Sequence, residues 1–236
     1  MLNNIYYFLT GLLSFKFRSN LKRKFVSYVA ANNLDKKIEN FINYKNGFYV
    51  ELGANDGINQ SNTFYFEKKK NWKGILIEPF ENNYKECKRN RSKKNKFFNA
   101  ACVANKNQKK IKLFYANLLT TSNLNKKNIK KIEKDKLHLD KKIKSKYFYA
   151  NAKTLNQILI LAKSPKIIDL LSLDVEGSEL NVLKGINFNN YVFKFMLIEC
   201  NEYRKIIKFL KTKNYILESY LGGKDYLFKY DFSIKA

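Results

Sequence analysis

The sequence has few of the residues from which cysteine- and histidine-based sites are built. It contains three cysteines, Cys87, Cys102 and Cys200, with no CxxC spacing, and a single histidine. This excludes a disulfide framework and the common Cys/His zinc clusters. Because Cys102 and Cys200 follow predicted buried strands, we expect them to be reduced core residues in a cytoplasmic protein.

Proline and glycine are also scarce, at two and nine residues. Their scarcity argues against a long disordered linker. A chain of 236 residues fits one α/β domain with additions. The hydrophobic content of 45% is ample for a buried core.

Arginine is rare in a chain that is otherwise strongly basic. The net charge is +26, yet only five of the 46 basic residues are arginine. A surface that binds nucleic acid is expected to use more arginine, because the forked guanidinium suits phosphates and base edges. We therefore interpret most of the charge as solvated lysine and do not expect nucleic acid to be the partner. An acidic glycan, a lipid surface or RNA stays the alternative.

The first 45 residues predict a helical segment that precedes a main domain over residues 46–236. Its apolar stretch, residues 5–15, is too short to span a bilayer. It lacks a small-residue cleavage site, so a signal peptide is not expected. Several basic residues follow up to position 24. The segment either packs on the core as a helix or contacts an anionic membrane peripherally through residues 1–24.

Predicted strands and helices alternate from residue 48 onward, which indicates a parallel sheet with helices on both faces. The predicted strands are residues 48–52, 74–77, 96–101, 109–115, 169–173 and 195–199. The predicted helices are residues 61–70, 80–91, 155–163, 179–184 and 202–213. Residues 215–219 and 225–229, joined at Gly222-Gly223, predict a closing antiparallel hairpin. The lysine-rich residues 126–146 are an insertion, either a loop or an exposed helix.

The first candidate site combines a glycine-rich turn with a carboxylate. Residues 48–57 read FYVELGANDG, and residues 74–79 read GILIEP, which ends the next strand at Glu78. An acid about 20 residues beyond such a turn binds ribose hydroxyls in nucleoside-cofactor sites. The pattern alone fits a nicotinamide or an S-adenosylmethionine (SAM) site. Glu51, just before the turn, can accept hydrogen bonds from a ligand ammonium or from loop amides.

Two later strands are also predicted to end in acids. Residues 169–180 read DLLSLDVEGSEL, which places Asp174 and Glu176 after a strand and Glu179 at a helix start. Residues 195–201 read FMLIECN, which delivers Glu199 and Asn201. Because the carboxyl ends of parallel strands meet at one edge, these acids should lie near the first two. Acids gathered in this way need a cation, a proton or a polar ligand.

In combination, these motifs resemble the FkbM-type SAM-dependent methyltransferases. VELGANDG, SNTFYFEKKKNWKGILIEP, IIDLLSLDVEGSELNVLKGINF and FMLIECN occur in that family's order. The likeness extends over residues 48–228. The resemblance implies a class I methyltransferase fold, which is a Rossmann-like, doubly wound seven-stranded sheet with one antiparallel strand. It also implies O-methylation, most often of a sugar hydroxyl in a glycan, glycolipid or glycosylated metabolite.

The resemblance further implies roles for individual residues. The turn residues would hold the methionine part of SAM, Glu78 the ribose, and the residues after the third strand the adenine. The implied cofactor-binding residues are therefore Glu51, Gly53, Ala54, Asn55, Asp56, Glu78, Asn99, Ala100 and Ala101. Asp174 and Glu176 would be catalytic. Many relatives carry Asp where this chain has Glu51, and the N-terminal segment and the insertion are poorly covered.

Methyl transfer to a sugar hydroxyl would benefit from a base near the oxygen. The resemblance places Asp174 or Glu176 there. A divalent cation is the alternative, since it would acidify the hydroxyl directly. Asp174, Glu199 and Asn201 would supply an all-oxygen ligand set of the kind that Mg²⁺ prefers.

Three other classes of protein compete with this interpretation. A nicotinamide-dependent oxidoreductase is disfavoured because the turn lacks GxGxxG spacing and Asp56 would approach a pyrophosphate. A basic nucleic-acid-binding protein or RNA methyltransferase is favoured by charge, but the chain lacks an NPPY-type base-clamp motif. A noncatalytic, membrane-tethered scaffold is disfavoured by the intact set of strand-end acids.

Overall fold

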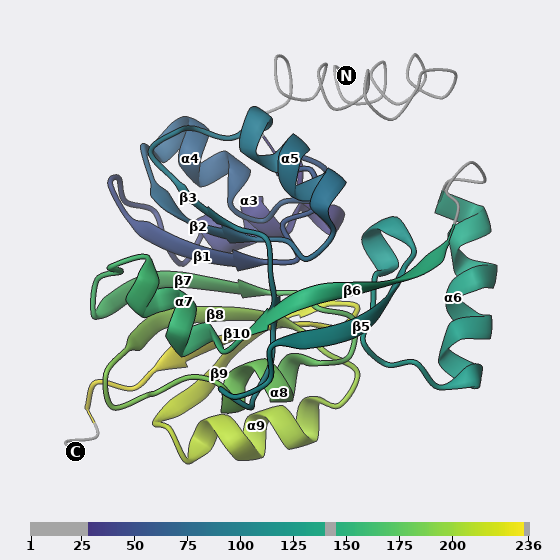
Figure 1. The fold of residues 1–236 in the computed structure, drawn as a ribbon. Helices are drawn as coiled ribbons and strands as arrows, with labels where there is room; N and C mark the ends of the chain where they lie inside the picture. The colour runs from purple at the N-terminus through teal and green to yellow at the C-terminus, as the bar shows by residue number, and fades with distance from the viewer. Residues whose placement is uncertain (1–27, 140–144, 234–236) are drawn as a thin grey trace.

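The computed structural model describes residues 28–139 and 145–233, and a seven-stranded sheet forms its centre (Figure 1). The spatial order of the strands is β3-β2-β1-β7-β8-β10-β9. The strand β10 runs antiparallel to both of its neighbours, β8 and β9, and the other pairings in this sheet are parallel. The strands are β1 (Phe48–Leu52), β2 (Lys73–Ile77), β3 (Lys96–Phe98), β7 (Ile167–Leu173), β8 (Val192–Glu199), β9 (Tyr215–Gly222) and β10 (Asp225–Tyr230). This topology confirms the predicted fold class.

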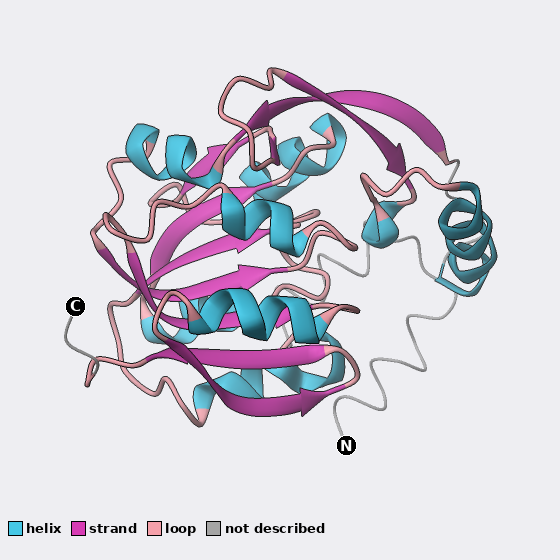
Figure 2. Ribbon diagram, turned by 90° about the horizontal axis from the view of Figure 1, so that it is seen from below, coloured by secondary structure: helices cyan, strands magenta, loops and turns pink. Residues whose placement is uncertain are grey.

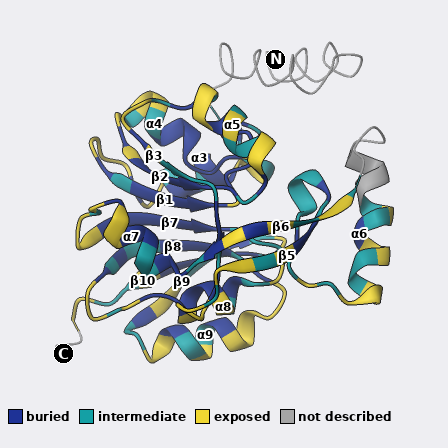
Figure 3. Cartoon of the chain, viewed as in Figure 1, coloured by how far each residue is buried: buried dark blue, intermediate teal, exposed yellow. Residues whose placement is uncertain are grey.

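Helices cover both faces of the sheet (Figure 2). The central strands are therefore buried on both sides, which explains why they read as continuous apolar runs (Figure 3). One face packs on α7 (Leu155–Leu161), α8 (Glu179–Lys184) and α9 (Tyr203–Lys211). The other packs on α3 (Leu34–Glu39), α4 (Phe64–Lys70) and α5 (Glu81–Asn90). A capping box formed by Thr154 and Gln157 begins α7.

A second, three-stranded sheet lies beside the first and was only partly predicted. Its strands are β4 (Ala101–Cys102), β5 (Lys110–Tyr115) and β6 (Lys146–Lys153), in the order β4-β6-β5. The predicted strand over residues 96–101 was wrong in its extent, because β3 ends at Phe98 and Ala101 pairs instead with β6. The prediction for residues 109–115 matches β5, whereas β6 was missed.

The lysine-rich insertion forms a helix, α6 (Lys126–Leu139), which settles the alternative between loop and helix. The helix is not wholly exposed. Ile132 is buried and packs with Phe114 and Ala116 at the end of β5. The insertion is thus attached to the small sheet, and Figure 1 shows α6 standing at its far end.

The described part of the N-terminal segment joins the main core. Leu34, Ile38 and Ile42 are buried in the same apolar cluster as Tyr49 of β1. The predicted membrane contact through residues 1–24 lies outside the described residues, and the domain boundary at residue 45 stays a prediction. Of the helices in residues 28–139 and 145–233, none combines the length and apolar content needed to cross a bilayer.

Candidate functional site

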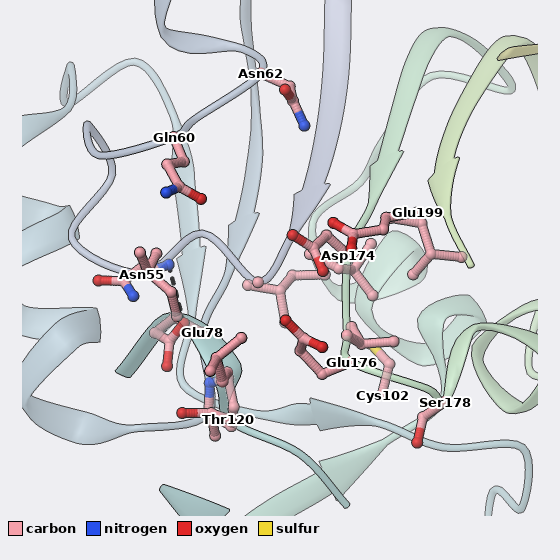
Figure 4. A pocket seen from close by; sticks show the side chains of 18 of the residues that line it. Asn55, Gln60, Asn62, Glu78, Cys102, Thr120, Asp174, Glu176, Ser178 and Glu199 are labelled. Carbon is pink, nitrogen blue, oxygen red and sulfur yellow. Dashed lines mark hydrogen bonds between the residues drawn. The ribbon is translucent and has the colours of Figure 1, made fainter. Parts of the chain in front are cut away.

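A cavity of about 410 Å³ opens at the carboxyl ends of β1, β2, β7 and β8 (Figure 4). Acid and amide side chains from separate elements face one another across it, and Asp174 lies between Glu78 and Glu199 in this view. The strand-end residues among its lining are Asn55, Glu78, Asp174, Glu176 and Glu199. In a doubly wound sheet this edge is where ligands bind.

The turn after β1 is held tightly between its two neighbouring strands. The backbone N–H groups of Gly53 and Ala54 both donate to the Ile77 carbonyl, each at 3.1 Å. Gly53 has a φ of 77°, and a Cβ there would lie 2.1 Å from the Asp174 carbonyl oxygen. Only glycine fits both the left-handed backbone and this close approach. The close packing brings the end of β7 directly against the turn.

Glu78 connects the end of β2 to the same turn. Its two carboxylate oxygens accept the N–H groups of Asn55 at 2.9 Å and Phe80 at 2.8 Å. The side chain is 5% exposed and lines the cavity. Burial raises the pKa of this carboxyl to about 7, because the charged form loses hydration. Each oxygen keeps a further lone pair for a ligand hydroxyl.

Two acids among the predicted cofactor residues do not reach the cavity. Glu51 is buried, and its carboxylate accepts hydrogen bonds from the Ser61 and Thr63 hydroxyls and the Asn62 N–H. Asp56 turns back into its own loop. Neither residue lines the cavity. Of the two alternatives for Glu51, hydrogen bonding to loop groups is the one observed, so both acids shape the turn.

Asp56 organises the turn through backbone hydrogen bonds. One of its carboxylate oxygens accepts the N–H groups of Ile58 at 2.9 Å and Asn59 at 2.8 Å. Asn55 adopts a φ of 46° and donates its side-chain amide to Asn117 at 3.0 Å. Ala54 is 2% exposed and packs in the core. Of these turn residues, Gly53 and Asn55 therefore line the cavity, together with Asn59 and Asn117.

Of the three predicted cofactor residues after β3, one lies outside the cavity lining and two belong to it. The Asn99 side chain donates to the Glu78 and Pro79 carbonyls at 2.9 and 3.1 Å and does not line the cavity. Ala100 and Ala101 do line it. Asn99 thus fixes the chain beside Glu78, while the two small residues form the wall.

The acids that follow β7 are destabilised in their charged form. Burial, followed by repulsion from Glu199 and Glu176, raises the pKa of Asp174 well above its ordinary value. Burial and the Glu199 charge raise the pKa of Glu176 to about 7. Glu176 has a φ of 52°, and its carbonyl accepts the Thr121 hydroxyl at 2.7 Å. Strained backbone and perturbed carboxyls together mark a functional site.

The magnesium alternative gains no support. Asn201 is exposed and does not line the cavity with Asp174 and Glu199. Across the ranges that the structure describes, no group of three or more His, Cys, Asp or Glu side chains is arranged to hold a metal ion. Glu179 begins α8 and accepts the Gly177 N–H at 2.8 Å, as expected for a helix-start residue.

Sequence reasoning missed several lining residues that come from loops and from distant segments. They are Ala31, Asn32, Asn59, Gln60, Asn62, Asn117, Thr120, Lys224 and Asp225. The pairing of Ala30 with Gln60 brings the N-terminal segment to the cavity, and no sequence motif marks it. For Asp225, the only signal was its place at the start of the strand that follows the Gly222-Gly223 turn.

The family of the chain follows from a comparison of its sequence with family models. The model of the methyltransferase FkbM domain matches residues 51–217. The chain belongs to the FkbM methyltransferase family. The FkbM match begins at Glu51 and includes the turn after β1, Glu78 and the acids at the carboxyl ends of β7 and β8. The N-terminal wall of the cavity and the β9–β10 turn lie outside the matched residues.

One solved structure and the curated sequences complete the comparison. A crystal structure of a methyltransferase from Geobacter sulfurreducens is similar with a TM-score of 0.45 and 12% sequence identity. The alignment covers 97% of this chain and 95% of that chain. Among curated proteins, none matches the chain.

Proposed function

We propose that this methyltransferase uses SAM to methylate a hydroxyl of a carbohydrate, in a glycan, a glycolipid or a glycosylated metabolite. The observation that carries the proposal is the buried Glu78 carboxylate, which lines the cavity beside the β1 turn. A carboxylate with free lone pairs at this place suits the two hydroxyls of a ribose. Three free cysteines support a reducing, cytoplasmic setting.

The charges of the cavity favour SAM over a phosphate-bearing cofactor. Its lining contains five acids and one lysine, namely Glu78, Asp174, Glu176, Glu199, Asp225 and Lys224. A dinucleotide would bring two phosphates into this negative potential, which is unfavourable. SAM carries no phosphate and has a positive sulfonium. The residues present therefore fit SAM, and they also argue against an RNA acceptor.

The chain's own residues would hold the cofactor in parts. Glu78 would accept the ribose hydroxyls, the turn at Gly53 and Asn55 would contact the methionine part, and Ala100 and Ala101 would leave room for the adenine. When bound, SAM supplies an electrophilic methyl group. The protein must then place an acceptor oxygen in line with that group, and positioning of this kind supplies several kcal/mol of barrier reduction.

Asp174 or Glu176 would receive the proton of the acceptor hydroxyl. The carboxylate would take the proton of the hydroxyl. The acceptor oxygen would then carry more electron density as it bonds to the methyl group. A base works best when its pKa lies near the working pH. The pKa of about 7 for Glu176 suits this role, and burial raises the pKa of Asp174 in the same direction.

A methyl-transfer assay with glycosides and RNA tests the proposal. The purified protein is incubated with SAM and a panel of neutral glycosides and amino sugars, and separately with RNA, and S-adenosylhomocysteine release and product mass are measured. The permethylated form of each glycoside is the matched control, because it lacks free hydroxyls. We expect transfer to at least one free glycoside and to no permethylated one. Transfer to RNA, or to nothing in the panel, would contradict the proposal.

A further inference from the structure

Two acids stand directly opposite each other at the edge of the cavity. Asp225, the first residue of β10, pairs with Glu199, the last residue of β8. Both line the cavity. Like charges at directly opposed positions of antiparallel strands destabilise the sheet. Burial and the Glu199 charge raise the pKa of Asp225 to about 6, which reflects the same cost.

Asp225 also differs from other buried acids of the molecule. It is 6% exposed, and its carboxylate forms no hydrogen bond or ion pair with the residues at 28–139 and 145–233. By contrast, Asp35 accepts three backbone N–H groups, and Asp169 accepts the Tyr44 hydroxyl and the Phe48 N–H. Buried carboxylates are normally satisfied. The Asp225 oxygens are not among the buried unpaired atoms of the described residues, so they are open to the cavity, where a ligand can reach them.

The nearby lysines do not supply that partner. Lys37 and Lys224 lower the pKa of Asp225 through space, but neither forms an ion pair with it. The Lys37 ammonium donates to the Leu221 carbonyl at 2.6 Å. Lys224 is the one basic residue in the described cavity lining, against five acids. Among the described residues, Glu199 and Asp225 therefore have no cation paired with them.

Two facing carboxylates restrict the kind of ligand group that can bind between them. A neutral hydroxyl would leave both charges in place, and a phosphate or carboxylate would add to the repulsion. A metal ion would need more ligands than the described part of the chain groups together here. A protonated amine carries the opposite charge and three donors, so it can bind both carboxylates at once.

We propose that the acceptor is an amino sugar whose protonated amine binds between Glu199 and Asp225. This inference rests on the proposed function, since it names the class of carbohydrate that the same cavity takes. Along the sheet edge, the strand order β2-β1-β7-β8 places Asp174 between Glu78 and Glu199, as in the view of Figure 4. The amine would thus sit on the far side of Asp174 from the ribose-binding carboxylate, with the hydroxyl to be methylated nearer Asp174.

The test is a calorimetric titration of the full chain, loaded with S-adenosylhomocysteine, with a fully deacetylated chitosan trisaccharide. The matched ligand is the N-acetylated trisaccharide, which has the same sugar backbone and carries a neutral acetamide in place of each ammonium group. We expect the deacetylated sugar to bind about tenfold or more tightly, as for a charge-assisted hydrogen bond. Equal affinity, or binding of neither sugar, overturns the inference. Methylation of neutral glycosides in that case would leave the proposed function standing.

Two variants locate the binding to Asp225. Asp225→Asn should abolish the preference for the deacetylated sugar and leave S-adenosylhomocysteine affinity unchanged. The matched control is Asp231→Asn, just beyond the other end of β10, where the carboxylate accepts from Ser233. Asp225→Asn should also raise the melting temperature, because it removes the repulsion with Glu199. A preserved preference, or a lower melting temperature, would contradict the assignment.

Discussion

The Asn55 N–H donates to a Glu78 carboxylate oxygen at 2.9 Å, so the turn after β1 and the acid after β2 form one unit. The second oxygen of Glu78 is fixed by Phe80. The carboxylate is therefore oriented before any ligand arrives, and no side-chain entropy is lost when a ligand binds to it. This explains how a buried acid can serve as the centre of a binding site.

Replacing Glu78 with Gln should weaken S-adenosylhomocysteine binding roughly thirty-fold, equivalent to about 2 kcal/mol. An amide has one acceptor oxygen, so its NH₂ group would face either the Asn55 or the Phe80 N–H, and a ribose hydroxyl would lose a charged acceptor. Isothermal calorimetry measures the affinity. Glu81→Gln is the control, because Glu81 is largely exposed and pairs only with Lys85. Equal affinity in the two variants would remove Glu78 from the site.

Binding of S-adenosylhomocysteine should depend on pH around 7. The pKa of Glu78 is raised to about 7 in the free protein, and ligand hydroxyls favour its ionised form. Affinity should therefore fall as the pH is lowered from 8 to 6, and the change should be absent in Glu78→Gln. A titration series at constant ionic strength checks this. An identical pH profile in the variant would assign the dependence to another group.

Asp174→Asn should lower turnover about a hundred-fold or more, which is the usual contribution of a general base. The amide cannot take the acceptor proton. S-adenosylhomocysteine affinity should change little, because Asp174 contacts the turn at Gly53 through its backbone carbonyl. The substitution leaves that carbonyl in place. Comparison of kcat with the calorimetric affinity separates the two effects. Full activity would transfer the role of base to Glu176.

Arg91→Met should lower the free energy of unfolding by about 3–5 kcal/mol, the usual effect of breaking a buried ion pair. The Arg91 side chain is fully buried and pairs with Glu51 at 3.3 Å and Glu67 at 2.8 Å. Both acids would be left without a cation. The control is Arg89→Met, whose exposed pair with Glu86 should contribute less than about 1 kcal/mol. Equal urea midpoints would contradict this account.

The fold was predictable where apolar runs end at a turn, as in β1 and β7. The strand β6 was not, because Tyr147 and Tyr149 are exposed among lysines and their pairing with β5 is set by tertiary contacts. The break after β3 depends on Asn99, whose amide is used to hold the carbonyls of Glu78 and Pro79. No local preference in the sequence reveals that contact.

The positions of the site residues along the strands were easier to predict than the directions in which their side chains point. Glu51 and Glu78 both end apolar strands, yet Glu51 turns to the Ser61–Thr63 hydroxyls and Arg91, while Glu78 faces the cavity. The difference arises from helix and loop contacts. Asp225 could not be recognised, since its significance depends on the register of β10 with β8.

The measurement that tests the central claim most directly is a calorimetric titration of the purified protein with S-adenosylhomocysteine, with NADH as the comparison ligand. The acidic cavity and Glu78 predict micromolar binding of S-adenosylhomocysteine and no detectable binding of NADH. Binding of NADH alone, or of neither ligand, would contradict the assignment of this cavity to SAM.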